Sequence, residues 1–153
     1  SNLKICDLTE NYIQVNSVDE LKNSLLSDTN NKLIISVGAP WILSDEFLES
    51  FEPDGIFNVH GTALPNDRGG TVVSWLIMNK KRLGNATIHK MVASPDAGPI
   101  LLAEEFIYPI ECQYPKDYLS YYNKQQEKLL TKLCLMWANE EINLLQLSEQ
   151  PHY

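Results

Sequence analysis

The chain has 153 residues, of which 44% are hydrophobic, which is enough for one compact domain with a buried core but not for two large domains. Its formal net charge of −8 disfavours a nucleic-acid partner, and its densest basic run is only the Lys80–Arg82 segment. No apolar stretch approaches the roughly 20 residues that span a bilayer, so we expect no membrane association.

The cysteines indicate a reducing compartment. Cys6, Cys112 and Cys134 are odd in number and far apart, so their spacing matches neither a zinc site nor a disulfide framework. No signal peptide is recognisable in the sequence. We therefore expect a cytoplasmic protein without a bound metal.

Strand and helix patterns alternate in the first part of the chain. A short strand is expected at Tyr12–Val15, and the capping-box pattern of Ser17–Glu20 predicts a helix that continues to about residue 27. The continuous apolar run Leu33–Val37 is typical of a strand buried on both faces. Ser44 is expected to cap a short helix whose inward-facing residues are Phe47, Leu48 and Phe51.

The alternation continues with a buried strand at Ile56–His60 and a helix at Thr71–Asn79. The helix is expected to place these residues on or near its core side: Val72, Trp75, Leu76 and Met78. Two further strands are predicted at Thr87–Val92 and Ile100–Ile107, joined by the loop 93–99.

A long amphipathic helix is predicted from Pro115 onward, because proline suits the first turn of a helix. Its apolar stripe is expected to contain Leu119, Tyr122, Leu129, Leu133 and Met136. Aromatic residues of this helix could pack on the chain's own core, which we expect for most of them, or bury surface in a homodimer.

This order of elements predicts an α/β fold with a mainly parallel sheet flanked by helices. Residues 1–110 would form the core, and residues 111–153 a helical extension packed on it. A nucleotide-binding α/β domain normally opens with a strand and a Gly-rich turn, but the first glycine here is Gly38. We therefore expect a fold without its first βαβ unit.

The segment after residue 56 is the first candidate site. Asn58 and His60 are two residues apart at the end of a predicted strand, so their side chains share one face. Pro65 and Gly69 then break the chain into a loop, and this position is the usual ligand crevice of an open α/β sheet. Considered alone, the pair is more typical of two satisfied polar side chains.

Asp96 adds a carboxylate in the loop 93–99, although an isolated Asp before Ala-Gly is more often a turn former. Together, an amide, an imidazole and a carboxylate suit the transfer of an acyl group to an amine. The amide can stabilise an oxyanion, and the imidazole can stabilise the same oxyanion or transfer a proton. The carboxylate can accept the amine's proton. No serine or cysteine is placed as a covalent nucleophile, which favours direct attack by the amine.

Two stretches resemble the folate-dependent formyltransferases. Asn58–Pro65 followed by Arg68-Gly69 is similar to the family's N-x-H…L-P…R-G signature, and Ala86–Met91 followed by Asp96–Leu101 to its strand and aspartate loop. The resemblance runs from about residue 33 to residue 107. It implies a Rossmann-like formyltransferase fold, 10-formyltetrahydrofolate as co-substrate, and Asn58, His60 and Asp96 as the catalytic trio.

The resemblance also implies a folate-binding region. The segment 38–43 falls where the family's pterin-binding loop follows its buried strand, so its residues would contact the pterin, partly through backbone groups. The implied cofactor-binding residues are Trp41, Ile42, Leu43, Gly38, Ser94 and Pro95. His89, on the neighbouring strand, is expected to be structural.

The acceptor amine is less strongly indicated. Members of the family formylate a purine precursor, methionyl-tRNA or the amino group of a nucleotide-linked sugar. Three features look closest to the amino-sugar enzymes: the segment His60–Thr62, the Gly69-Gly70 pair and the Ser74-Trp75 pair. The predicted partner is therefore a small-molecule amine, a sugar nucleotide. The missing Gly-rich loop keeps two alternatives open: a formyltetrahydrofolate hydrolase, and a non-catalytic folate- or nucleotide-binding remnant.

Overall fold

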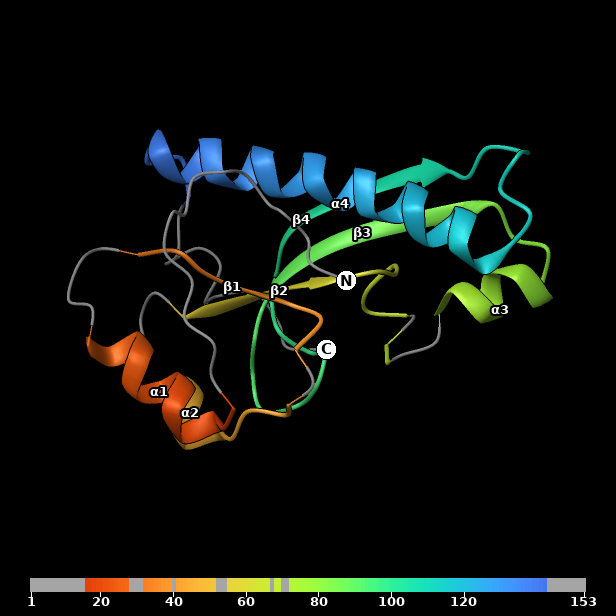
Figure 1. The fold of residues 1–153 in the computed structure, drawn as a ribbon. Coiled ribbons are helices and arrows are strands. Elements are labelled where there is room, and N and C mark those ends of the chain that lie inside the picture. Colours follow the sequence, from red (N-terminus) through yellow and green to blue (C-terminus); the bar gives the residue numbers. More distant parts are fainter. Residues whose placement is uncertain are drawn as a thin grey trace.

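A four-stranded sheet and four helices make up the part of the chain that the computed structural model describes, which is residues 16–27, 32–39, 41–51, 55–66, 68–69 and 72–142 (Figure 1). In chain order the elements are α1 (Val18–Ser27), β1 (Ile34–Val37), α2 (Asp45–Glu49), β2 (Ile56–His60), α3 (Val72–Met78), β3 (Leu83–Lys90), β4 (Ile100–Ile107) and α4 (Pro115–Ala138). The strand predicted at residues 12–15 and Cys6 lie outside the described residues.

The described sheet has the order β1-β2-β3-β4 and is mixed. β1 and β2 are parallel, whereas β2–β3 and β3–β4 are antiparallel, so the prediction of a mainly parallel sheet is wrong for these strands. The physical reason is clearest for β3 and β4: the loop 91–99 is too short for the crossover of a dozen or more residues that a parallel pair needs. The predicted α/β class, with helices beside the sheet and a long C-terminal helix, is confirmed.

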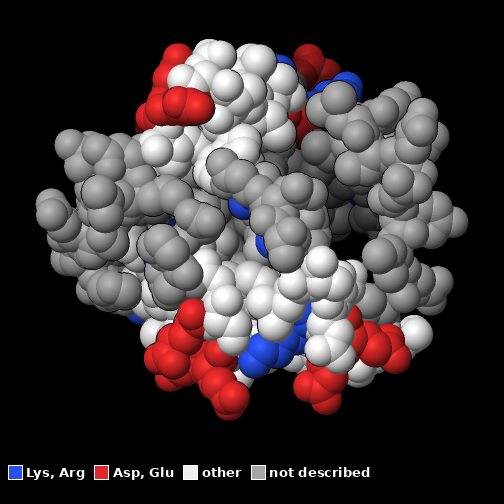
Figure 2. Space-filling view, turned by 90° about the vertical axis from the view of Figure 1, so that its left-hand side faces the viewer, with Lys and Arg blue, Asp and Glu red and all other residues white. Residues whose placement is uncertain are grey.

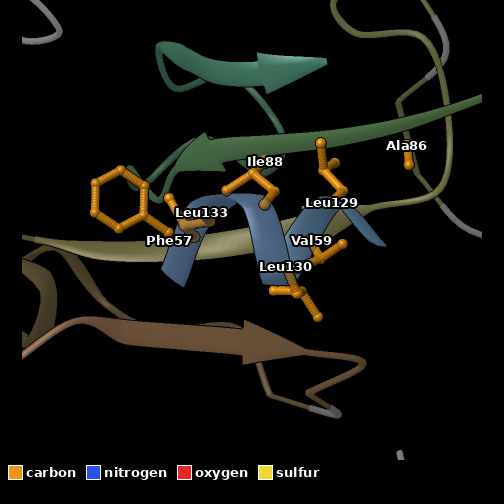
Figure 3. Close-up of a cluster of buried hydrophobic side chains, with 7 residues drawn as sticks. All are labelled: Phe57, Val59, Ala86, Ile88, Leu129, Leu130 and Leu133. Atoms are coloured by element: carbon orange, nitrogen blue, oxygen red, sulfur yellow. The ribbon is translucent and has the colours of Figure 1, made fainter. Parts of the chain in front are cut away.

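The main core lies between α4 and one face of the sheet. Alternate side chains of β2 and β3 point toward α4 because successive residues of a strand face opposite sides. They meet three fully buried leucines of the helix (Figure 3), and the cluster comprises Phe57, Val59, Ala86, Ile88, Leu129, Leu130 and Leu133. At roughly 1.5–3 kcal/mol for each large buried side chain, this cluster is a major contribution to the stability of the sheet.

The opposite face of the sheet is covered at one end by α1 and α2 (Figure 1). Ile56, the first residue of β2, is buried there against Phe47 and Leu48 of α2, as predicted for that short helix. The side chain of Ser44 accepts a hydrogen bond from the Phe47 N–H at 3.3 Å and so caps α2. β1 is only half-buried along its length, so the expectation that both of its faces are buried is wrong.

The predicted start of α1 is confirmed in detail. Ser17 accepts a hydrogen bond from the Glu20 N–H at 3.2 Å, and the Glu20 carboxylate in turn accepts one from the Asn16 N–H at 2.8 Å.

Acidic side chains of α1 and α2 gather at the bottom of the face shown in Figure 2, and further acidic groups lie at its top.

α3 packs through a different face from the one predicted. Leu76 and Ile77 pack against the buried aromatic cluster of Tyr108 and Tyr118, whereas Trp75 is 60% exposed and Met78 is 72% exposed. The expectation that Trp75 and Met78 face the core is therefore wrong, and the side chain of Val72 is outside the described part of the structure. A seven-residue helix whose only polar side chain is that of Ser74 carries too little pattern to reveal which face is covered.

α4 has 24 residues and begins at Pro115, as predicted. Leu129 and Leu133 are buried as expected, but Leu119 is exposed, which corrects that part of the predicted stripe. Tyr118 and Gln126 are buried instead. No described helix is both long and apolar enough to cross a membrane.

Candidate active site

The candidate site begins where the cover of α1 and α2 ends. Ile56, Asn58 and His60 point to the same face of β2, because residues two apart in a strand share a face. Ile56 is buried under the helices, whereas Asn58 and His60 are only partly buried. The strand therefore carries apolar side chains where it is covered and polar ones where that cover ends.

β3 continues this polar surface. Asn58 lies opposite His89 and His60 opposite Thr87 in the antiparallel ladder, so the side chains of each pair are neighbours on one face. The Thr87 hydroxyl lies 2.8 Å from both the Thr62 carbonyl and the Asn85 side-chain oxygen. Asn85, Thr87 and His89 thus form a polar row on the face of β3 that points away from α4.

Asp96 joins this surface from the loop after β3. Its Oδ1 lies 3.4 Å from His60 Nδ1 and 3.5 Å from His89 Nε2. Its Oδ2 accepts a hydrogen bond from the backbone N–H of Gly69 at 3.1 Å. The Asp96 backbone has a φ of +55°, a left-handed conformation that Asp tolerates better than most residues. The carboxylate therefore lies between two imidazoles and accepts a hydrogen bond from the loop that follows β2.

His89 is the member of this cluster whose contacts the sequence did not reveal. It is 2% exposed and was expected to be structural, yet its Nε2 lies 3.3 Å from Asn58 Nδ2. The sequence did carry a weak signal, because polar residues occupy alternate positions 85, 87 and 89 of a strand that is otherwise mostly apolar. Which residue lies opposite His89 depends on strand register, which the sequence did not show.

The protonation of His89 follows from its surroundings. Burial lowers the pKa of His89 below its usual value, and this effect exceeds the opposing effects of the Lys90 carbonyl and the Asp96 carboxylate. Because a carbonyl can only accept a hydrogen bond, Nδ1, at 3.0 Å from the Lys90 oxygen, carries the proton of the neutral ring. Nε2 is then free to accept a hydrogen bond from the Asn58 amide.

A cavity of about 160 Å³ adjoins the cluster. Four of the six predicted cofactor-binding residues line it, together with Asn58, His89 and Asp96, and these four are Trp41, Ile42, Leu43 and Pro95. The other two, Gly38 and Ser94, are exposed and lie outside the cavity wall.

Two further features of this cavity matter for ligand binding. Ser36, which lies beside Asn58 in the parallel β1–β2 pair, also lines the wall, and its buried hydroxyl has no hydrogen-bond partner within the described residues. Gly38 has a φ of +62°, so it supplies the turn that brings residues 41–43 to the cavity. The described chain contains no group of three or more His, Cys, Asp or Glu side chains suited to a metal ion.

A family model described as formyl transferase matches residues 8–130. The chain belongs to the formyl transferase family. Asn58, His60, His89 and Asp96 all lie within the matched region, as does the cavity that adjoins them.

Solved structures share the formyl transferase fold. A phosphoribosylglycinamide formyltransferase from Anaplasma phagocytophilum is 20% identical with a TM-score of 0.71, over 82% of this chain and 61% of that one. The sugar 3N-formyl transferase WlaRD, crystallised with dTDP and 5-N-formyl-THF, is 24% identical with a TM-score of 0.60, over 71% of this chain and 38% of that one.

A formyltetrahydrofolate deformylase from Pseudomonas putida KT2440 is 19% identical with a TM-score of 0.62, over 74% of this chain and 40% of that one. At these identities the likeness shows the fold alone, and the chain spans at most 61% of the length of these three proteins. Because one is a phosphoribosylglycinamide formyltransferase, one a sugar formyltransferase and one a deformylase, the shared fold does not identify an acceptor.

Proposed function

We propose that this chain transfers a formyl group from 10-formyltetrahydrofolate to a primary amine, by direct attack of the amine on the formyl carbon. The observation that carries the proposal is the convergence of Asn58, His60 and Asp96 beside the cavity that Trp41 and Leu43 help to line. Three polar groups of different chemistry at the edge of an apolar pocket are a common arrangement in catalytic sites.

The cavity suits one end of the folate. Pockets that hold a whole ligand typically have volumes of about 300–1,000 Å³. This cavity, of about 160 Å³, is smaller, so it would hold only the bicyclic pterin, and the rest of the co-substrate would lie outside. Trp41 and Leu43 offer apolar contacts to the ring faces. The unpartnered Ser36 hydroxyl offers a hydrogen bond to a polar atom at the ring edge, which supports a ligand with polar edges here.

Asn58 and His60 would stabilise the charge that develops on the formyl oxygen. The Asn58 amide has two N–H groups, and donating one of them to His89 leaves the other for this oxygen. The His60 ring, two residues further along β2, would donate a second hydrogen bond or handle a proton. His89 would hold the Asn58 amide in its orientation and is therefore a positioning residue.

Asp96 would accept the proton that the amine gives up. A new bond forms between the amine nitrogen and the formyl carbon, and the bond from that carbon to N10 of the folate breaks. The proton passes from the amine to the Asp96 carboxylate and then to N10, so no charge is left behind. His60, at 3.4 Å from Asp96, would orient the carboxylate.

The acceptor that we propose is the amino group of a nucleotide-linked sugar. The support is the His60–Thr62 segment and the Ser74-Trp75 pair of the sequence, and the similarity of the fold to WlaRD, whose structure holds dTDP and 5-N-formyl-THF. A small-molecule acceptor is also consistent with the formal net charge of −8, which disfavours an RNA substrate.

The test is to incubate the full chain with 10-formyltetrahydrofolate and dTDP-linked amino sugars, and to measure tetrahydrofolate and formamide formation. We expect His60→Ala and Asp96→Ala each to reduce the rate on the order of 10²–10³-fold. Asp19→Asn, at an exposed carboxylate of α1, is the matched control and should not change the rate. Full activity in both site variants would refute the proposal.

The same assay separates the two alternatives. Folate turnover without any added amine would identify a hydrolase. Binding of 5-formyltetrahydrofolate without turnover under any condition would identify a non-catalytic folate-binding protein.

A further inference from the structure

A second and larger cavity, of about 630 Å³, lies on the same side of the sheet as the candidate active site. Its volume is within the range of small-molecule sites. The walls come from the loop after β2, from α3 and the residues that follow it, from the beginning of β3, and from β4, which contributes the carboxylate Glu105 opposite Asn85. Thr62 and Asn85, which contact Thr87, belong to the polar surface described above, but no wall residue takes part in the catalytic steps proposed for Asn58, His60 and Asp96.

Strand register connects the two cavities. Asn85 lines the second cavity and His89 lines the first, and both side chains point to the face of β3 that is turned away from α4. Thr87, which lies opposite His60, is between them. Two residues of strand, about 7 Å, separate Asn85 from Thr87, so a ligand that fills the second cavity and reaches His60 extends along this polar row.

The loop after β2 also connects them. Arg68 lines the second cavity, and the backbone N–H of the next residue, Gly69, donates a hydrogen bond to Asp96 Oδ2. A ligand held by Arg68 would therefore contact the residue next to the one that bonds Asp96, the carboxylate that we propose as the proton acceptor.

The second cavity has the chemistry of a nucleotide site. Arg68 and Lys81 both line it, and within the described residues neither side chain makes an ion pair or a hydrogen bond. Guanidinium and ammonium groups bind phosphate oxygens. Trp75 also lines the cavity, and its ring, 60% exposed, can stack on a nucleobase. Stacking on a nucleobase would explain why Trp75 is exposed, which contradicted the predicted packing of α3.

We infer that the second cavity binds the acceptor as a nucleoside-diphosphate-linked amino sugar, with the diphosphate against Arg68 and Lys81 and the base on Trp75. The sugar then points along the polar row toward His60 and Asp96. This inference rests on the proposed function and adds to it the site that holds the acceptor and the residues that recognise it.

The test is a calorimetric titration of the full chain with dTDP, with thymidine and pyrophosphate as partial probes. We expect dTDP to bind more tightly than either partial probe. Arg68→Ala and Lys81→Ala should each weaken dTDP binding on the order of tenfold and reduce its dependence on salt concentration. Trp75→Ala should weaken dTDP and thymidine but not pyrophosphate, by roughly tenfold or more.

Two control variants match these changes. Met78→Ala alters an exposed apolar residue of the same helix that is not part of the cavity wall, and Lys128→Ala removes an exposed ammonium from α4 on the other side of the sheet. Both should bind dTDP as the parent chain does. Equal binding in Arg68→Ala, Lys81→Ala and Trp75→Ala, or no binding of dTDP to the parent chain, would refute the inference.

A parallel titration with 5-formyltetrahydrofolate separates this inference from the proposed function. If formyl transfer to an amine occurs while dTDP does not bind, the inference fails and the proposed function stands. If dTDP binds through Trp75 and Arg68 but no amine is formylated, the proposed function fails, and with it the assignment of this cavity to the acceptor.

Discussion

Asn58 and His89 face each other across the β2–β3 pair, with Asn58 Nδ2 and His89 Nε2 3.3 Å apart. The buried, neutral ring of His89 can accept a hydrogen bond from only one side, because its other nitrogen donates to the Lys90 carbonyl. This arrangement fixes which atoms of the Asn58 amide point toward the site. It connects a core residue to the group that we propose to contact the formyl oxygen.

The first prediction concerns this positioning role. His89→Leu removes the acceptor for the Asn58 amide, and we expect kcat for formyl transfer to fall about ten- to hundredfold, as for other supporting residues of reactive sites. The KM for the folate should change little, because the cavity wall keeps its shape. His89→Gln retains a side-chain oxygen that can accept the same hydrogen bond and should recover part of the lost kcat. Equal kcat values for the Leu and Gln variants would contradict the role.

The second prediction concerns stability against pH. His89 has a lowered pKa in the folded chain, so between its ordinary pKa of 6.5 and that lower value the unfolded chain binds more protons than the folded one. The free energy of unfolding should therefore fall as the pH decreases through this window, and it should not depend on His89 above it. Urea denaturation from pH 7.5 to pH 5 measures this, and His89→Gln should show a shallower dependence. An unchanged slope in that variant would show that other groups cause the dependence.

The third prediction concerns the unpartnered hydroxyl of Ser36. Ser36→Ala removes no hydrogen bond within the described residues, so the free energy of unfolding should stay the same or rise slightly. If the hydroxyl bonds the pterin, the affinity for 5-formyltetrahydrofolate should fall about five- to tenfold, the equivalent of one hydrogen bond. Ser120→Ala, at an exposed position of α4 outside the cavity wall, is the control. Unchanged affinity in Ser36→Ala would remove this residue from the folate site.

The fourth prediction compares two glycines of the loops around the site. A Cβ at Gly98 would lie 1.8 Å from the Lys90 carbonyl oxygen, which is backbone of β3 and cannot move aside easily. Gly98→Ala should therefore destabilise the chain by about 3 kcal/mol or more. Gly38→Ala meets no atom within 4 Å but has a φ of +62°, so its effect should be only about 1–2 kcal/mol. Thermal unfolding followed by circular dichroism ranks the two, and the reverse order would contradict this reading of the 91–99 loop.

Local features of the fold were predictable from the sequence. The caps at Ser17 and Ser44 depend on groups within four residues of each other, so composition and spacing were sufficient to predict them. The start of the long helix at Pro115 followed in the same way. The division of the chain at residue 110 into a core and a helical extension stays a prediction.

The candidate site was predictable only in part. The shared face of Asn58 and His60 follows from the period of two in a strand, and the loop of Asp96 was visible as a run of turn-forming residues. The distance between His60 and Asp96 was not predictable, because it depends on how the 91–99 loop folds back over β3. The assignment of catalytic roles to these residues remains a proposal.

The sequence by itself determined the type and order of the described elements, the caps of the helices and the amide–imidazole pair, because each of these depends on residues close together in the chain. The tertiary structure decided the antiparallel direction of β3, the exposed side of α3 and the contact of His89 with Asn58, 31 residues away. These depend on strand register and on which surfaces meet in the folded chain. A pattern along one segment can show that a residue is apolar or polar, but not which distant residue lies opposite it.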